Sequence, residues 1–201
     1  MRPNPLYDPR DDHAACGLGF VVRVSGEADH SIVEMGLEVL RKMEHRGATG
    51  ADPETGDGAG LLLQLPDGFL RRWAREEVDT ELPPPGEYAV AMAFLPRDPA
   101  QQLICEELLV RITHEEGQVP IGWRDVPVDS AHVGRLARES EPVIRQLFVA
   151  RGRGVGADAF RRKLYVIRRR VELASAARQV AEATFSLASF SNTTLTYKGL
   201  H

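Results

Sequence analysis

Cysteine is scarce in this chain of 201 residues, which carries only Cys16 and Cys105, far apart in the sequence. Two cysteines so separated form neither a disulfide framework nor a cysteine-rich zinc site. No apolar run approaches the ~18 residues that span a membrane, and the first thirty residues lack the apolar core of a signal peptide. We therefore expect a reduced, cytoplasmic protein without a membrane partner.

Strong positive charge is also missing, because the formal net charge is −4. This balance disfavours nucleic acid as the main partner. We also expect no metal site, because the candidate histidines are not spaced as metal ligands. They are His13, His30, His114 and His132.

Cys16 stands at the head of an apolar segment, expected as a strand over residues 19–24. The preceding residues, 1–15, contain Pro3, Pro5 and Pro9 and show no apolar periodicity. If residues 1–15 are a propeptide that is removed, the Cys16 thiol and its own α-amino group become neighbours. A terminal amine in that position can activate a nucleophile. The alternative is a small buried cysteine that opens a strand.

Two further motifs follow the helix expected over residues 31–44, whose start has Ser31 and Glu34 spaced as a capping box. In His45-Arg46-Gly47, the arginine can bind a carboxylate with two hydrogen bonds, or it is a surface cation near a helix end. The loop from Thr55 to Gly60, with Asp57 among its glycines, lets backbone N–H groups approach a ligand. The alternative for this loop is a plain hairpin turn.

The rest of the chain alternates predicted strands and helices. Asp98 and Pro99 begin a helix that runs to about residue 115 and holds Cys105 in the core. The other expected helices cover residues 68–74, 130–138, a short stretch ending at 163, and 171–182, the last with Leu173, Ala177 and Val180 inward. The expected strands cover residues 61–65, 88–95 (central in its sheet), 121–126, 143–150 and 164–168, with a hairpin over 184–190 and 194–197.

The three motifs in this order resemble the class II glutamine amidotransferase domain that begins the large chain of glutamate synthases. The resemblance rests on Cys16-Gly17-Leu18-Gly19-Phe20, His45-Arg46-Gly47-Ala48 and Thr55-Gly56-Asp57-Gly58-Ala59-Gly60. Residues 142–149, residues 162–169 and the closing Thr196-Tyr197-Lys198-Gly199 are similar as well, so the likeness covers nearly the whole chain.

The resemblance implies an α+β fold of the N-terminal-nucleophile hydrolase type, in which two antiparallel sheets are stacked between helical layers (αββα). It implies that residues 1–15 are a propeptide and that residues 16–201 are the amidotransferase domain. Cys16 would attack the side-chain amide of L-glutamine, forming a thioester that water hydrolyses to glutamate. Arg46 would hold the α-carboxylate of glutamine, and Gly47 and Asp57 would line the same pocket.

The resemblance also implies a larger assembly in which the released ammonia reaches 2-oxoglutarate, so that nitrogen is assimilated into glutamate. FMN and an iron–sulfur cluster would belong to the full-length protein, and none is expected within this chain. The partners would be the remainder of the large chain and a small subunit.

The sequence departs from the family at one point, because it contains no His-Asn-Gly-Glu segment to supply the oxyanion hole. We therefore expect a truncated domain, incomplete at its C-terminus and weak or inactive alone. Two alternatives stay open. One is another amidohydrolase of the same fold, which would use Cys16 without needing Arg46 to bind a carboxylate. The other is a detached, non-catalytic module, which would retain residues 1–15.

Overall fold

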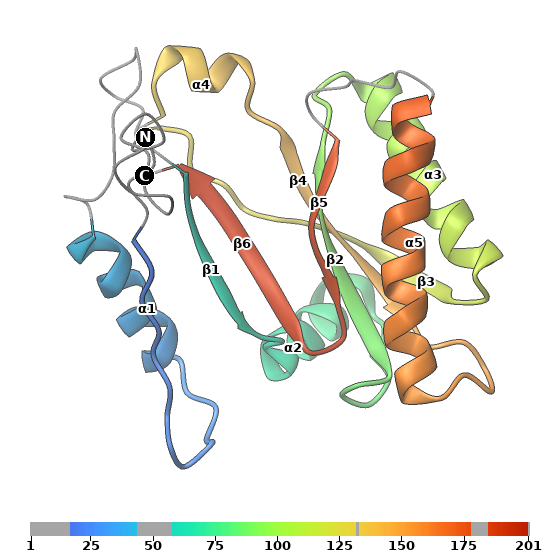
Figure 1. Cartoon of the computed structure of the whole chain (residues 1–201), viewed down its shortest axis with the longest axis horizontal. Coiled ribbons are helices and arrows are strands. Elements are labelled where there is room, and N and C mark those ends of the chain that lie inside the picture. The colour runs from blue at the N-terminus through green and yellow to red at the C-terminus, as the bar shows by residue number, and fades with distance from the viewer. Residues whose placement is uncertain (1–16, 44–57, 132, 178–184, 201) are drawn as a thin grey trace, which may run out of the picture. The chain divides into compact units, whose positions relative to one another are not determined.

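The computed structural model describes residues 17–43, 58–131, 133–177 and 185–200, and these form an α+β fold with antiparallel sheets (Figure 1). The elements in chain order are α1 (Ser31–Lys42), β1 (Gly58–Gln64), α2 (Asp67–Val78), β2 (Tyr88–Leu95), α3 (Pro99–Glu115), β3 (Val119–Asp125), α4 (Arg135–Glu139), β4 (Val143–Ala150), α5 (Ala157–Ala177), β5 (Ser186–Ser191) and β6 (Thr194–Leu200).

The chain divides into two compact units. In the first, the structure describes residues 17–43, 58–61, 133–137 and 198–200; the second comprises residues 62–131 and 138–197, apart from 178–184. No helix in the described ranges has the length and apolar character needed to cross a membrane.

The second unit is built on a four-stranded sheet in the order β3-β4-β2-β5. β2 pairs with β4 on one side, from Tyr88 opposite Ala150 to Leu95 opposite Val143, and with β5 on the other. The prediction of a central strand over residues 88–95 is therefore confirmed. Seven of its eight residues are buried, which explains why its sequence is almost wholly apolar.

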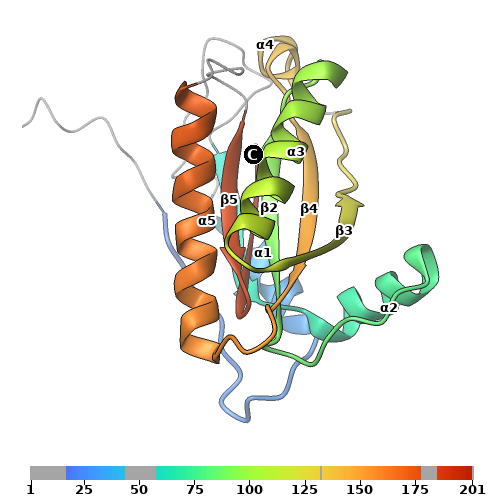
Figure 2. The same ribbon diagram turned by 90° about the vertical axis from the view of Figure 1, so that its right-hand side faces the viewer.

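The two faces of this sheet bury separate apolar cores, because successive strand residues point to opposite sides. Ala91, Ala93 and Leu95 of β2 pack with α3 and α5, which lie together on one face (Figure 2). Tyr88, Val90 and Met92 pack on the other face, with residues of α2 and the first part of β6. Within this unit, the sheet is thus covered by helices on one side and by α2 and β6 on the other.

Helix α3 agrees with its prediction in detail. The Asp98 carboxylate accepts a hydrogen bond from the Gln101 N–H at 2.9 Å, and Pro99 occupies the first turn. Cys105, a residue of this helix, is fully buried in the core, as predicted.

Residues 157–177 correct the sequence analysis, which expected two helices separated by a strand over 164–168. They form one helix, α5, because Phe160, Leu164, Ile167 and Val171 recur at helical spacing and are all buried. Leu173 was expected inward and is 63% exposed. Val180 lies outside the described residues.

Three further expectations are wrong. Residues 19–24 form no strand, and among the described residues they carry no strand partner. The helix expected over 130–138 is limited to α4, a single turn over residues 135–139. Residues 186–200 form no hairpin: the chain turns at Asn192, but β5 pairs with β2 whereas β6 pairs with β1 in a second, two-stranded sheet.

Candidate functional site

The four residues predicted for the site, Cys16, Arg46, Gly47 and Asp57, lie outside the described residues. The structure describes their neighbours in the chain. Gly17 directly follows Cys16, Met43 precedes Arg46 by three positions, and Gly58 directly follows Asp57. These three neighbours all belong to the first unit.

Residues 17–23 run antiparallel to helix α1. A Cβ at Gly17 would lie 2.8 Å from Sδ of Met43, and one at Gly19 would lie 2.4 Å from Cγ1 of Val39. At the other end, Nη2 of Arg23 donates to Oγ of Ser31 at 3.0 Å. The segment therefore contacts the end of α1 near Gly17 and the beginning of α1 near Arg23.

Glycine permits this close approach, most strictly at position 19, where an added Cβ would clash with Val39; at position 17 the atom in the way is the end of the flexible Met43 side chain. Val39 is β-branched and sits in a helix, where its side chain has little rotational freedom. The Gly-x-Gly spacing after Cys16 is thus explained by packing of the backbone against α1.

The turn between this segment and α1 is held by Asp29. Its carboxylate accepts the Ser31 N–H at 2.8 Å and lies 3.5 Å from Nη2 of Arg23. The hydrogen bonds from Ser31, followed by the charge of Arg23, lower the pKa of Asp29. The capping box predicted for Ser31 and Glu34 is wrong, since Ser31 is already helical and no side chain caps from the preceding residue His30.

Strand β1 completes the described part of this unit. Gly36 of α1 lies against Leu61 of β1, with only 3.3 Å from a Cβ at Gly36 to Cδ2 of Leu61. The absence of a side chain at Gly36 allows β1 to approach α1 closely. Gly58 faces the Gly199 carbonyl of β6 at 3.8 Å. The end of α1, the beginning of β1 and the end of β6 lie on the same side of Figure 1.

The second cysteine has none of the properties of a nucleophile. Burial, and to a lesser extent the neighbouring Glu106, raise the pKa of Cys105 to about 11. Because the thiolate is the reactive form, this thiol is inert near neutral pH.

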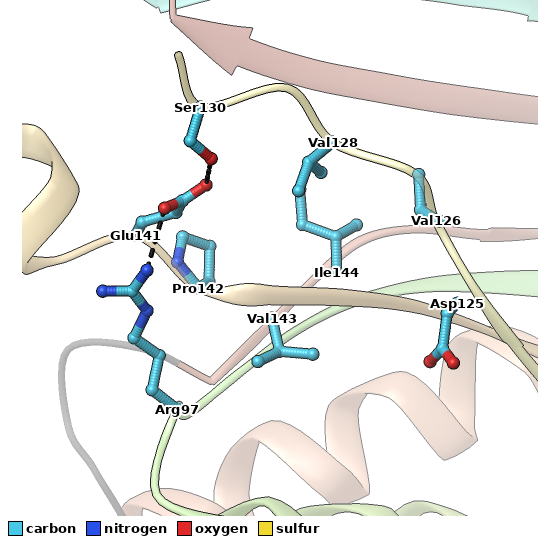
Figure 3. A pocket seen from close by; sticks show the side chains of 9 residues that line it. All are labelled: Arg97, Asp125, Val126, Val128, Ser130, Glu141, Pro142, Val143 and Ile144. Carbon is cyan, nitrogen blue, oxygen red and sulfur yellow. Dashed lines mark hydrogen bonds and ion pairs between the residues drawn. The ribbon is translucent and has the colours of Figure 1, made fainter. Parts of the chain in front are cut away.

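A pocket of about 290 Å³ opens in the second unit between the loop after β3 and the start of β4 (Figure 3). Glu141 is one of its lining residues and accepts hydrogen bonds from Ser130 and from Nη2 of Arg97, the latter at 2.9 Å. The remaining lining is Asp125, which pairs with Arg145, and five apolar side chains, namely Val126, Val128, Pro142, Val143 and Ile144. The charges of Arg97 and Glu141 already satisfy each other, and no cysteine, histidine or lysine lines the pocket. We therefore do not assign the chemistry to it.

No group of three or more His, Cys, Asp or Glu that could hold a metal ion occurs in the described ranges. Sequence reasoning missed one polar cluster in the second unit, formed by Arg124, Gln146, Phe69 and Trp73. A glutamine in the middle of the apolar strand over residues 143–150 was the one signal for it.

The comparisons with known proteins agree on one family. The family model described as glutamine amidotransferases class-II matches residues 16–201. The chain is 40% identical to the glutamate synthase [NADPH] large chain of Bacillus subtilis, covering 97% of this chain and 12% of that protein. It is 36% identical to the corresponding large chain of Azospirillum brasilense, covering 96% and 13%. It is also 36% identical to the ferredoxin-dependent glutamate synthase 1 of Arabidopsis thaliana, covering 97% and 12%.

This chain therefore spans roughly an eighth of the length of these relatives. The family match begins at Cys16 and runs through the described parts of both units. The chain belongs to the class-II glutamine amidotransferases.

Proposed function

We propose that this chain is the glutaminase portion of a glutamate synthase and that Cys16 is its nucleophile. The Cys16 sulfur attacks the side-chain amide carbon of L-glutamine, the C–N bond breaks, and the nitrogen leaves as ammonia with the thiol proton. Water then attacks the thioester carbonyl, the C–S bond breaks, and glutamate and the free thiol are regenerated.

The observation that carries this proposal is the antiparallel contact between residues 17–23 and α1. Gly17 lies against Met43, and the chain continues from these two residues to Cys16 in one direction and to Arg46 in the other. Three residues span at most ~10 Å, so this contact supports the proposal that position 46 lies near position 16. A nucleophile and a substrate-holding arginine need such proximity.

In this proposal, Arg46 binds the α-carboxylate of glutamine through two parallel hydrogen bonds. Gly47 and Asp57 line the same pocket, and Gly58, which follows Asp57, belongs to the same unit as Gly17. The α-amino group of Cys16 accepts the thiol proton, which requires that residues 1–15 be removed as a propeptide. The start of the family match at residue 16 supports this boundary.

We also propose that the fold is completed as the four-layer αββα arrangement of N-terminal-nucleophile hydrolases, over a domain of residues 16–201. In the second unit, α3 and α5 pack on one face of the four-stranded sheet, and α2 and the beginning of β6 pack on the other. In the first unit, α1 packs on β1 through Gly36 and Leu61. These contacts, each within one unit, support the proposal.

The further partners follow from the same proposal. The ammonia would be transferred to 2-oxoglutarate by the remainder of a glutamate synthase, with a small subunit, in the cytoplasm. FMN and an iron–sulfur cluster would belong to that remainder. The described residues do not fit the iron–sulfur cluster, because a cluster needs several cysteine thiolates and the described Cys105 is buried in the core.

The test combines the intact mass and N-terminal sequence of the chain with labelling by a diazoketone analogue of glutamine. Labelling needs only an activated thiol and a bound α-carboxylate, so it does not depend on full turnover. We expect a chain that begins at Cys16 and carries one adduct on that residue. Cys16→Ser abolishes the adduct, whereas the matched control Cys105→Ala retains it.

The alternatives give different results in the same experiment. A chain that still begins at Met1 and forms no adduct is a non-catalytic module and contradicts the proposal. An adduct that forms equally fast with an analogue lacking the α-carboxylate indicates another amidohydrolase and removes the role given to Arg46.

A further inference from the structure

Arg124 is the most deeply buried cation of the described residues, at 8% exposed. It lies on β3 directly opposite Gln146 of β4, and its Nη1 donates to Oε1 of that fully buried glutamine at 3.0 Å. Its guanidinium carbon lies 5.2 Å from the ring centre of Phe69 and 5.7 Å from that of Trp73, both on α2. Two aromatic faces and one amide therefore surround the charge.

The guanidinium has an unused hydrogen-bonding edge. Its Nε is buried without any hydrogen-bond partner, and among the described residues neither Nη2 nor the charge as a whole has a carboxylate. A guanidinium keeps its charge in proteins, and a buried charge without a counter-ion is unfavourable. Contact with aromatic rings offsets only part of that cost.

Arg145 on the neighbouring strand gives the internal comparison. It too lies beside an aromatic ring, with its guanidinium carbon 5.3 Å from the ring centre of Trp123. In contrast to Arg124, it pairs with two carboxylates, Glu106 at 2.7 Å and Asp125 at 2.6 Å. Within the described ranges, the fold thus supplies counter-ions to one strand arginine and leaves the more buried one without any.

We propose that Arg124 is a carboxylate-binding site, in which the two oxygens of the ligand accept from Nε and Nη2. That edge presents two parallel N–H donors, which match a carboxylate. Phe69 lies over the guanidinium and is 41% exposed, so it is the side chain that moves aside to admit the ligand. Trp73 stays in place because it stacks on Phe148, with ring centres 5.0 Å apart.

Two kinds of molecule carry such a carboxylate group: a small free carboxylic acid, and a polypeptide with an Asp or Glu side chain. The geometry of Arg124 accommodates the carboxylate group in either case. The inference does not depend on the reaction assigned to Cys16, and its test uses no measurement of glutamine chemistry.

The test follows the Nε–H signal of Arg124 by heteronuclear NMR in the whole chain. The probes are acetate, glutarate and the capped peptide acetyl-Gly-Glu-Gly-amide, each added up to about 10 mM, with chloride at matched ionic strength as the blank. We expect a saturable downfield shift, since a hydrogen bond to a carboxylate deshields the proton. Arg124→Lys keeps the charge but loses the donor edge, so it abolishes the response. Arg145→Lys is the matched control and retains it.

A further variant keeps the inference testable if Arg124→Lys does not fold. Phe69→Ala uncovers the guanidinium without altering it, and we expect it to lower the dissociation constant several-fold. Saturation by acetate or glutarate identifies a free acid as the ligand, and saturation by the peptide alone identifies an acidic side chain. An Nε–H signal that no probe shifts beyond the chloride blank, in wild type and in Phe69→Ala, overturns the inference.

Discussion

The backbone of Gly19 lies so close to Val39 that a Cβ at position 19 would stand 2.4 Å from Cγ1 of the valine. With the Gly17–Met43 contact, this fixes how the segment that leaves Cys16 lies along α1. The Gly-x-Gly spacing is therefore a packing requirement of the helix that leads to Arg46. It links the segment that follows Cys16 and the helix that precedes Arg46, which are far apart in the sequence, through one contact surface.

Gly19→Ala should displace the segment from α1. Val39 cannot rotate away in the helix, so the backbone must move, at a cost of about 1–3 kcal/mol in unfolding free energy. We expect labelling of Cys16 by the glutamine analogue to slow at least about tenfold, which corresponds to a barrier change of about 1.4 kcal/mol. The double variant with Val39→Ala should recover much of both losses, because it removes the clashing methyl group. A Gly19→Ala chain that labels at the wild-type rate would refute this link.

Gly152→Ala should destabilise the second unit. A Cβ at Gly152 would lie 1.9 Å from the Gly117 carbonyl oxygen, and the Gly152 N–H donates to Oε1 of Gln118 at 2.9 Å. Backbone cannot yield as a side chain does, so we expect a loss of at least about 1–3 kcal/mol in urea unfolding. The matched control is Gly156→Ala, because no atom lies within 4 Å of its added Cβ. Equal unfolding midpoints for the two variants would contradict the prediction.

The sequence predicted best those elements whose burial pattern is unambiguous. The strands over residues 88–95 and 143–150 agree with β2 and β4 residue for residue. For β2 the reason is its almost wholly apolar sequence, which is typical of a strand buried on both faces. The prediction of a strand over residues 164–168 is wrong, since a short apolar run fits a strand or a helix equally well. Only the spacing from Phe160 to Val171, read as a whole, favours the single helix α5.

Pairing partners could not be predicted from one sequence. Residues 19–24 have the composition of a strand, but a strand also needs a neighbour that supplies backbone hydrogen bonds. The switch of β6 to the other sheet, and the register that sets Arg124 opposite Gln146, are likewise long-range choices. The order of the three motifs around Cys16, Arg46 and Asp57 indicated the family, whereas the polar cluster of Arg124 was invisible until the strands were paired.

Acid should destabilise the chain partly through Glu116. Its carboxylate accepts from Nζ of Lys163 at 2.6 Å and from Nη1 of Arg170 at 2.8 Å, and these bonds hold its pKa below the usual 4.5. In acid the unfolded chain therefore binds more protons than the folded one at this site. The stabilisation is complete above about pH 4.5 and disappears as the pH falls through the lower pKa of the folded state. We expect the urea midpoint of Glu116→Gln to fall less steeply than that of wild type between about pH 5 and about pH 3. Parallel profiles would show that the ion pairs do not contribute.

The chain should self-associate through the outer face of residues 18–24. Leu18, Phe20, Val22 and Val24 alternate along this segment and are 94%, 89%, 72% and 99% exposed, while the intervening Gly19 packs on α1. This segment has no strand partner among the described residues, and an extended segment of that kind with an apolar face invites pairing with another chain. We expect sedimentation at micromolar concentration to show species larger than the 22.2 kDa monomer, and the double variant Leu18→Ser with Phe20→Ser to shift them toward monomer. Leu173→Ser is the matched control, because Leu173 is likewise a well-exposed apolar residue, at 63%, but lies on α5. If Leu173→Ser dissociates the larger species to the same extent as the double variant, the association is non-specific and hydrophobic, and the face of residues 18–24 is not its cause.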